Sequence, residues 1–346
     1  MNTFQVLDRY ASYADLSSEI KPFDKNRDLA SALSEAPFLM APMAGVSDKA
    51  YRLMARAAGA SLAYTEMVSV AGIHFKSDKT WDLVIPDEAE GDIAVQLFGS
   101  KPEQFEEAAS LVQKRLGSRL ALIDINMACP VPKVVKKGEG SALMETPELA
   151  SEIVKATSNS VDVPTTVKIR AGRYENNQNA AEFAKLMQDS GASAVAVHGR
   201  YATQFYTGTS NTDVVKAVVD SVDVPVIASG DMDSATSCIE KKAYTGATAV
   251  FCARGTYGNP WIFKDAYNLT QGIEVPTRTI EQRMAAFCCH VRLLEATGAH
   301  MARARSLAGW YFKGIPGAAA IRGRAVYLNT ADEFCSLAEE VLAIED

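Results

Sequence analysis

The chain has 346 residues, of which 48% are hydrophobic and 22% are charged, an ordinary composition for a globular protein. It is long enough to bury a large core without disulfide bonds, and no run of 18 or more apolar residues indicates a membrane span. A net charge of −7 argues against a protein that binds nucleic acid through its overall charge.

The N-terminal segment, residues 1–28, carries charges throughout and has no apolar core of the kind found in secretion signals. The six cysteines form no C-x-x-C pair, and no spacing suggests a zinc site. Cys288, Cys289 and His290 are adjacent on a predicted helix, where neighbouring side chains point in different directions and chelate poorly. We therefore expect a cytoplasmic protein with reduced thiols and no metal.

Eight short β-rich runs alternate with amphipathic stretches between residues 37 and 255. The predicted strands are residues 38–42, 61–66, 93–99, 122–128, 165–170, 194–200, 225–231 and 248–255. Pro102–Leu116 and Asn179–Ser190 are predicted helices between them, and the sequence SVDVP precedes a strand at 160–164 and again at 221–225. Eight repeated units over about 220 residues predict a (β/α)8 TIM barrel. A doubly wound sheet would need a G-x-G-x-x-G loop after the first strand, where the sequence is APMAGVSD.

From about Thr279 onward the pattern is helical only, with candidate helices at residues 280–297, 302–312 and 330–344. The predicted organisation is an α/β protein with three parts. Residues 1–36 form an extension without an assigned role, residues 37–270 the barrel, and residues 271–346 a smaller all-helical C-terminal domain. Between Arg283 and Arg324 the net charge is +6, which indicates either a phosphate-binding face or an ordinary solvated helix surface.

Polar and small residues gather at the carboxyl ends of the predicted strands, where barrels place their active sites. The glycine-bearing ends of the last two strands occupy the usual phosphate position, and Arg254 can add a charged fork. Lys168 beside a flavin would stabilise its reduced form, and Gln96 offers a donor and an acceptor to a pyrimidine edge. This pattern predicts a barrel oxidoreductase that uses FMN.

Five motifs in order resemble the tRNA-dihydrouridine synthase family: APMAGVSDKAYR (41–52), INMACPVPKVVKKGEGSALM (125–144), KIR (168–170), HGRYATQFYTG (198–208) and GNPWIF (258–263). The resemblance implies an FMN site in the barrel mouth, with Cys129 as the proton donor. The implied cofactor-binding residues are Pro42, Met43, Ala44, Gln96, Lys168, His198, Ser229, Gly230, Asp231, Ala253 and Arg254. Asn126 and Arg170 are expected to read the uracil.

The same resemblance implies that the enzyme reduces the C5=C6 bond of uridine in tRNA, with NADPH or NADH reducing the flavin from the same open face. The helical domain is expected to bind the tRNA. Five further residues are expected to contact the RNA: Lys133, Lys136, Lys137, Arg200 and Gln204. Two alternatives remain: an FMN barrel that acts on a free small molecule of the dihydroorotate or enoate type, and a non-catalytic RNA-binding protein.

Three positions depart from the family pattern. Alanine replaces the usual glycine at Ala128 and at Ala253, and Ala202 stands where a basic residue is usual. If the backbone at Ala128 required a positive φ, the substitution would strain the loop by roughly 1 kcal/mol.

Overall fold

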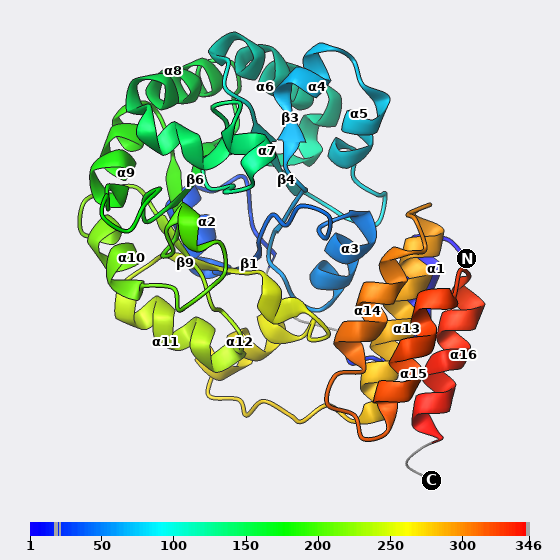
Figure 1. Cartoon of the computed structure of the whole chain (residues 1–346). Coiled ribbons are helices and arrows are strands. Elements are labelled where there is room, and N and C mark those ends of the chain that lie inside the picture. The colour runs from blue at the N-terminus through cyan, green and yellow to red at the C-terminus, as the bar shows by residue number, and fades with distance from the viewer. Residues whose placement is uncertain (17–19, 21, 344–346) are drawn as a thin grey trace.

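The fold is a closed barrel of eight parallel strands with helices around it and a helical bundle at one side, seen in a computed structural model that describes residues 1–16, 20 and 22–343 (Figure 1). β1 pairs with both β2 and β9, and β2 pairs with β4, so the ring closes. The eight strands are β1 (Phe38–Met40), β2 (Ala63–Tyr64), β4 (Ile93–Phe98), β5 (Leu120–Asn126), β6 (Thr165–Arg170), β7 (Ala194–His198), β8 (Val226–Ser229) and β9 (Ala249–Cys252). The short β3 (Val68–Ser69) pairs only with β4. The predicted barrel is confirmed.

The surrounding helices are α3 (Lys49–Ala57), α4 (Val70–His74), α5 (Asp78–Val84), α6 (Pro102–Leu116), α8 (Pro147–Ser158), α9 (Ala180–Asp189), α10 (Thr212–Val219), α11 (Ala235–Thr245) and α12 (Ile262–Thr270). Proline begins α6 and α8, because its missing N–H would have no partner in a first helical turn. Several predicted strands run one to three residues beyond the observed ones. In those places the chain has left the ladder to form the loops that carry the polar residues.

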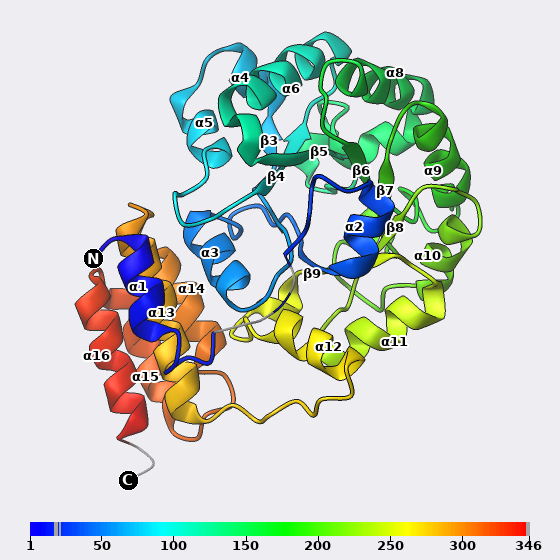
Figure 2. The same ribbon diagram turned by 180° about the vertical axis from the view of Figure 1, so that it is seen from behind.

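Residues of the N-terminal extension close the end of the barrel opposite these loops. α2 (Leu29–Glu35) lies across that end, as Figure 2 shows. Its Leu29 and Leu33 pack with Phe23 against apolar side chains from the strand interiors. Asp28 begins the helix by accepting the N–H of Ser31 at 2.9 Å. The extension therefore supplies part of the barrel core.

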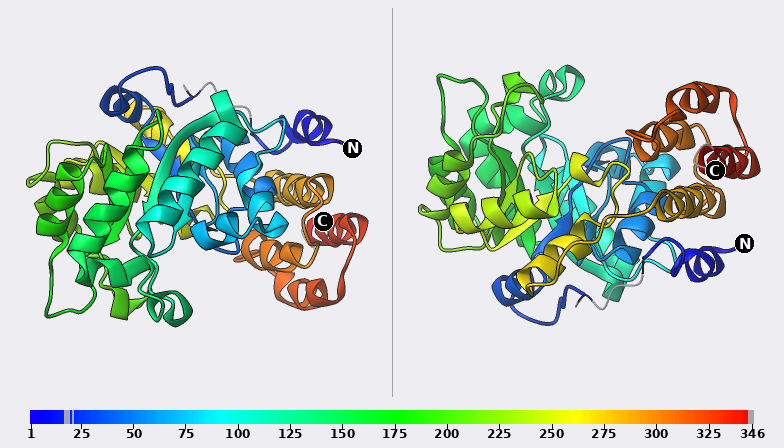
Figure 3. Two further views of the ribbon diagram at one scale, coloured as in Figure 1. Left: turned by 90° about the horizontal axis from the view of Figure 1, so that it is seen from above. Right: turned by 90° about the horizontal axis from the view of Figure 1, so that it is seen from below.

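The helical bundle contains α13 (Ile280–Ala296), α14 (Arg303–Tyr311), α15 (Ala318–Arg324) and α16 (Ala331–Leu342). α1 (Thr3–Tyr10) from the other end of the chain lies against it (Figure 3). Just after α1, the carbonyl of Ala14 accepts from Trp261 Nε1 at 2.8 Å, and Asp15 pairs with Lys264 and Arg278. The first residues thus tie the bundle to the barrel. No helix in the described part of the chain has the length and apolar character needed to cross a bilayer.

Side chains of α14 join the bundle to loops at the mouth of the barrel. Arg303 on α14 pairs with Asp48 at 2.7 Å and with Glu66 at 3.2 Å. Trp310 of the same helix stacks on Tyr257 with ring centroids 3.9 Å apart and an interplanar angle of 9°. The bundle is therefore held next to the loops that follow β1, β2 and β9.

Most charged side chains of the basic segment from Arg283 to Arg324 are paired within the protein. The six arginines of the segment donate to protein acceptors, whereas the ammonium group of the exposed Lys313 bonds no described residue. The arginines are Arg283, Arg292, Arg303, Arg305, Arg322 and Arg324. A charge reversal at Arg303 would break its contact with the barrel, so it would not test RNA binding by itself.

Candidate active site

One cavity of about 330 Å³ opens at the carboxyl ends of the strands. Fourteen of the residues predicted for the site line it: Pro42, Met43, Ala44, Gln96, Asn126, Cys129, Lys168, Arg170, His198, Ser229, Gly230, Asp231, Ala253 and Arg254. They converge because all eight strands are parallel and end at the same mouth. The described residues contain no cluster of His, Cys, Asp and Glu side chains that could hold a metal ion.

Cys129 follows β5 in a loop that is fixed at several points. Its backbone N–H donates to Asn126 Oδ1 at 2.9 Å, and its carbonyl accepts from the N–H of Ser141 at 3.0 Å. Burial raises the pKa of the Cys129 thiol, although the N–H of Val131 and the charge of Arg170 favour the thiolate. The side chain is therefore a protonated thiol at neutral pH, which is the state needed for an acid.

Lys168 and Arg170 project from β6 into the cavity next to Cys129. No acceptor in the described part of the chain bonds the Lys168 ammonium group, and burial together with the charge of Arg170 lowers the pKa of Lys168 to about 8. Arg170 donates from Nε to Ala128 O at 2.8 Å and from Nη1 to the carbonyls of Tyr201 and Phe205. Only the second amino group of Arg170 is left for a bound molecule.

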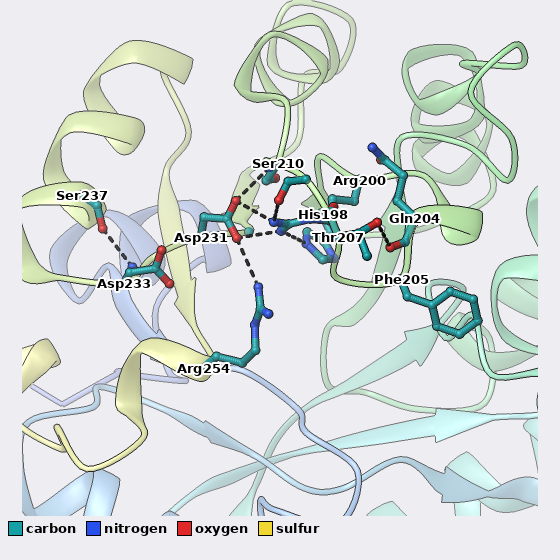
Figure 4. A network of polar contacts seen from close by, with 12 residues as sticks. His198, Arg200, Gln204, Phe205, Thr207, Ser210, Asp231, Asp233, Ser237 and Arg254 are labelled. Atoms are coloured by element: carbon teal, nitrogen blue, oxygen red, sulfur yellow. Dashed lines mark hydrogen bonds and ion pairs between the residues drawn. The ribbon is translucent and has the colours of Figure 1, made fainter. Parts of the chain in front are cut away.

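His198, Arg200 and Asp231 form a polar network beside the cavity (Figure 4). Arg200 Nη1 lies 3.4 Å from His198 Nε2, and since arginine only donates, Nε2 is the acceptor and Nδ1 carries the proton. Burial and the nearby cations lower the pKa of His198 well below its ordinary value, so the ring is neutral. His198 can therefore offer one N–H to a ligand without adding charge.

Arg200, predicted from the sequence to contact the substrate, has its donors occupied by protein groups in this structure. Its side chain is 2% exposed, and its five N–H groups face protein acceptors: two on Asp231, one on His198, and the carbonyls of Thr207 and Gly208. The residue instead fixes the loop after β7 onto the end of β8. The sequence pattern placed Arg200 at the strand end correctly but did not show that its donors are already used.

The ends of β8 and β9 form a cradle for an anionic group. Lys241 of α11 donates to the carbonyls of Gly230 and Asp231, which turns the following N–H groups of Asp231 and Met232 the opposite way. Neither N–H bonds another described residue. Gly230 has φ +113°, and a Cβ there would lie 2.2 Å from Ser210 Oγ and 2.7 Å from His198 Cδ2. Only glycine lets the backbone take this path.

Asp231 supports this cradle rather than filling it. Its carboxylate accepts from Arg200 at 2.7 Å and 2.8 Å, from Arg254 at 3.2 Å and from the N–H of Ser210 at 2.8 Å. Burial acts to raise the pKa of Asp231, but the hydrogen bonds and charge of Arg200 outweigh it and the pKa is lowered. The carboxylate thereby orients Arg254, whose side chain remains 41% exposed and can reach an anion.

The loop of residues 42–44, between β1 and α3, is held from both sides. The N–H of Met43 donates to Ser47 Oγ at 3.0 Å, and the N–H of Gly45 donates to Glu66 Oε2 at 2.5 Å. Glu66 is the same carboxylate that pairs with Arg303 of the bundle. The wall of the cavity and the position of the bundle are therefore linked through one side chain.

Several predicted RNA contacts lie outside the cavity. Lys133, Lys136 and Lys137 are exposed in and after α7 (Pro132–Val135), and Gln204 Oε1 accepts the N–H of Tyr201 at 2.8 Å. The cavity wall also includes residues that the sequence prediction omitted: Met67, Phe205, Tyr206 and Tyr257. Tyr206 is 57% exposed, and the guanidinium carbon of Arg254 lies over its ring, 4.8 Å from the ring centroid. Its position inside the HGRYATQFYTG motif was the available signal.

The alanine substitutions do not fall in the left-handed backbone region that favours glycine. Neither Ala128 nor Ala253 has a positive φ; in the described chain the non-glycine residues with positive φ are Asp15, Lys76, Phe205 and Asp231. The conditional strain considered for Ala128 therefore does not arise. Ala202 is buried in a short 3-10 turn, Ala202–Gln204, and offers no group to RNA.

Comparison with known proteins assigns this arrangement to a family. Residues 39–345 match the family model for dihydrouridine synthase. The chain belongs to this family. Among relatives, tRNA-dihydrouridine synthase B of Vibrio parahaemolyticus is 38% identical over 282 residues, which cover 80% of this chain and 86% of the relative. The protein named probable tRNA-dihydrouridine synthase 1 of Synechocystis sp. is 36% identical over 312 residues, which cover 88% of this chain and 86% of the relative.

Among solved structures, histamine dehydrogenase from Rhizobium sp. 4-9 superposes with a TM-score of 0.50 at 12% identity, covering 74% of this chain and 49% of that one. This likeness concerns the barrel fold alone. Membership of the family makes this dihydrouridine synthase a flavin-dependent oxidoreductase.

Proposed function

We propose that this dihydrouridine synthase reduces the C5=C6 bond of uridine in tRNA to 5,6-dihydrouridine in the cavity at the barrel mouth, with Cys129 as the proton donor. The relatives named as tRNA-dihydrouridine synthases support the substrate. The observation that carries the proposal is the convergence of a protonated thiol, an unpaired lysine and an anion cradle on one cavity. Family membership disfavours the small-molecule alternative.

The residues of the cavity fit FMN. The N–H groups of Asp231 and Met232 with the guanidinium of Arg254 would hold its phosphate, and the tight turn at Gly230 matches that use. Lys168 and Gln96 would face the ring, where the lysine charge favours the reduced state. When bound and reduced, FMN supplies hydride to carbon C6 of the uracil.

The chain's own residues then handle the proton. The Cys129 thiol gives its proton to carbon C5, and the negative charge left on the sulfur faces Arg170 and Lys168, both of which favour the thiolate. The free amino group of Arg170 and the amide of Asn126, both in the cavity wall, would bind the uracil oxygens. These positions give the thiol one defined target atom.

The uridine must leave the RNA stack to enter the cavity. Lys133, Lys136 and Lys137 are exposed directly after the Cys129 loop, where they would hold the flanking phosphates and make binding depend on salt. The helical bundle beside the mouth would bind the body of the tRNA. NADPH or NADH would reduce the flavin through the same open face. The six free cysteines suit the reducing cytoplasm, where we place the reaction.

The test of the proposed function compares substrates. The flavin-loaded protein, supplied with NADPH or NADH, should form dihydrouridine in unmodified tRNA with a far higher kcat/KM than in free uridine. The product is measured by nucleoside mass spectrometry after digestion of the RNA. Equal turnover of free uridine, or faster turnover of a dihydroorotate or enoate, would assign the cavity to the small-molecule class instead.

Lys168→Ala should slow reduction of the flavin by the nicotinamide by about 10²-fold, the usual size of losing one electrostatic contact in a dry site. The pKa of Lys168 is lowered to about 8, so the wild-type charge is present below that pH and is lost above it. The wild-type rate should therefore fall as pH rises past 8, whereas Lys168→Arg should keep its rate. Stopped-flow absorbance of the flavin measures both. A normal rate in Lys168→Ala would remove the lysine from this role.

A further inference from the structure

A chain of side-chain hydrogen bonds crosses the barrel interior beneath the cavity. Thr166 Oγ1 donates to Asp124 Oδ1 at 2.6 Å, and Gln96 Nε2 donates to Asp124 Oδ2 at 2.7 Å. Gln96 Oε1 accepts in turn from Asn126 Nδ2 at 2.8 Å. Asp124 and Gln96 are each 1% exposed and Asn126 is 7% exposed, so these bonds are made away from bulk water.

This chain of hydrogen bonds ends at the backbone of the Cys129 loop. Asn126 Oδ1 accepts the N–H of Ala128 at 3.2 Å and that of Cys129 at 2.9 Å. Asp124 is not part of the cavity wall, and its carboxylate is linked to the loop by the side-chain amides of Gln96 and Asn126.

The order of donors and acceptors along this chain is set from the carboxylate outward. An ionised carboxylate accepts hydrogen bonds and donates none, so Gln96 must turn its NH₂ group toward Asp124. Its oxygen is then left for the NH₂ group of Asn126, whose own oxygen is left for the loop. Since backbone N–H groups only donate, a reversed chain would set two donors against each other at Cys129.

We propose that Asp124 is a positioning residue that orients the Cys129 loop through Gln96 and Asn126. The inference rests on the proposed role of Cys129 as the acid. Burial raises the pKa of Asp124 to about 6 against the hydrogen bonds from Thr166 and Gln96, so the carboxylate is ionised at neutral pH. Gln96 and Asn126 both line the cavity, and the same order of donors and acceptors leaves one N–H of each side-chain amide facing it. A bound ring must therefore present acceptor atoms to these two residues.

Isosteric substitutions can keep or reverse this chain. Thr166→Val leaves Asp124 accepting from Gln96, so the order is unchanged. Asp124→Asn also preserves it, because the new NH₂ group can turn to the Thr166 hydroxyl, which can accept. In the double variant D124N/T166V that hydroxyl is gone, and the acceptor within reach is Gln96 Oε1. That acceptor becomes available only in a competing arrangement, in which Gln96 and Asn126 turn around and an NH₂ group faces the backbone N–H of Cys129. The unsatisfied NH₂ group in the native order therefore makes this loop-releasing arrangement more accessible than in the wild type, by roughly one hydrogen bond.

The measurement is hydrogen exchange of the Ala128 and Cys129 amides in the full-length protein, with and without flavin. These amides should exchange about tenfold faster in D124N/T166V, the factor expected for the net loss of roughly one hydrogen bond. Both single variants should exchange near the wild-type rate. Asn126→Leu, which removes the acceptor itself, calibrates complete release of the loop, and amides of α13 serve as an internal reference.

An unchanged exchange rate in the folded double variant, or a release in Asp124→Asn alone as large as in the double, would overturn the inference. The direction can also be read without substitutions, so a folding failure would not decide the matter. Through-hydrogen-bond NMR couplings are expected from Gln96 Nε2 to the Asp124 carboxylate carbon and from Asn126 Nδ2 to the Gln96 side-chain carbonyl carbon; the opposite couplings would contradict the order. These readouts do not depend on turnover, so they separate this inference from the assignment of Cys129 as the acid.

Discussion

Cys129→Ala should bind FMN, accept electrons from the nicotinamide and bind tRNA, yet oxidise its reduced flavin with tRNA about 10²–10⁴-fold more slowly than the wild type, the usual range for losing a general acid. The physical reason is that hydride addition at C6 leaves negative charge that only a nearby proton can neutralise. Cys129 is the cavity-lining cysteine in the described structure, and burial keeps its thiol protonated by raising its pKa. The measurement is single-turnover absorbance of pre-reduced flavin after adding unmodified tRNA.

Two further cysteine variants sharpen this test. Cys129→Ser should also be slow, because a hydroxyl group is a far weaker acid than a thiol. Cys335→Ala is the matched control, since Cys335 is a half-buried thiol on α16, outside the cavity. It should react like the wild type. Wild-type reoxidation by Cys129→Ala would show that the proton comes from another group and would remove Cys129 from the mechanism.

Gly230→Ala should weaken FMN binding by about 10²-fold or more, because charge-assisted hydrogen bonds to a phosphate are each worth roughly 1.5–3 kcal/mol. Gly230 has φ +113°, and an added Cβ would lie 2.2 Å from Ser210 Oγ and 2.7 Å from His198 Cδ2. To make room, the chain must shift the N–H groups of Asp231 and Met232 that form the proposed phosphate cradle. The flavin content of the purified protein and a fluorescence titration with FMN measure the effect.

Gly246→Ala supplies the control for backbone strain alone. Gly246 ends α11 with φ +71°, and its added Cβ would meet only Val219 Cγ1, at an ordinary 3.5 Å. This variant should lose roughly 1 kcal/mol of stability and keep its flavin affinity. If Gly230→Ala, folded by circular dichroism, retained full flavin with unchanged affinity, the phosphate would lie elsewhere in the cavity.

The site could be predicted from the sequence where a residue's role follows from its place on a strand. Cys129 and Gly230 follow apolar runs and Lys168 lies in the second half of a strand, and parallel strands of a closed barrel bring such positions to one mouth. The repeated helix–loop–strand units and the late change to helices likewise show in residue order alone, because periodicity is a local property. No knowledge of distant contacts was needed for these conclusions.

The roles of the arginines depended on the tertiary structure. Arg170 and Arg200 are two arginines at neighbouring strand ends. All five N–H groups of Arg200 bond protein acceptors, whereas one amino group of Arg170 remains free. Arg303, in the segment expected to bind RNA, pairs instead with Asp48, 255 positions earlier in the chain. Which acceptors surround a guanidinium is set by the folded packing of distant segments.

The N-terminal extension and Asp124 show the same limit. Residues 3–10 pack on α13 from the opposite end of the chain, and their own sequence pattern does not predict this contact. Asp124 is one acidic residue within an apolar strand, and its link to Cys129 exists only because β4 and β5 are neighbours in register, with Gln96 beside Asp124. The sequence by itself determined the barrel and the residues at its mouth, through local periodicity and strand ends. The tertiary structure alone decided which of those residues remain free to react, because hydrogen-bond partners are chosen by distance in space.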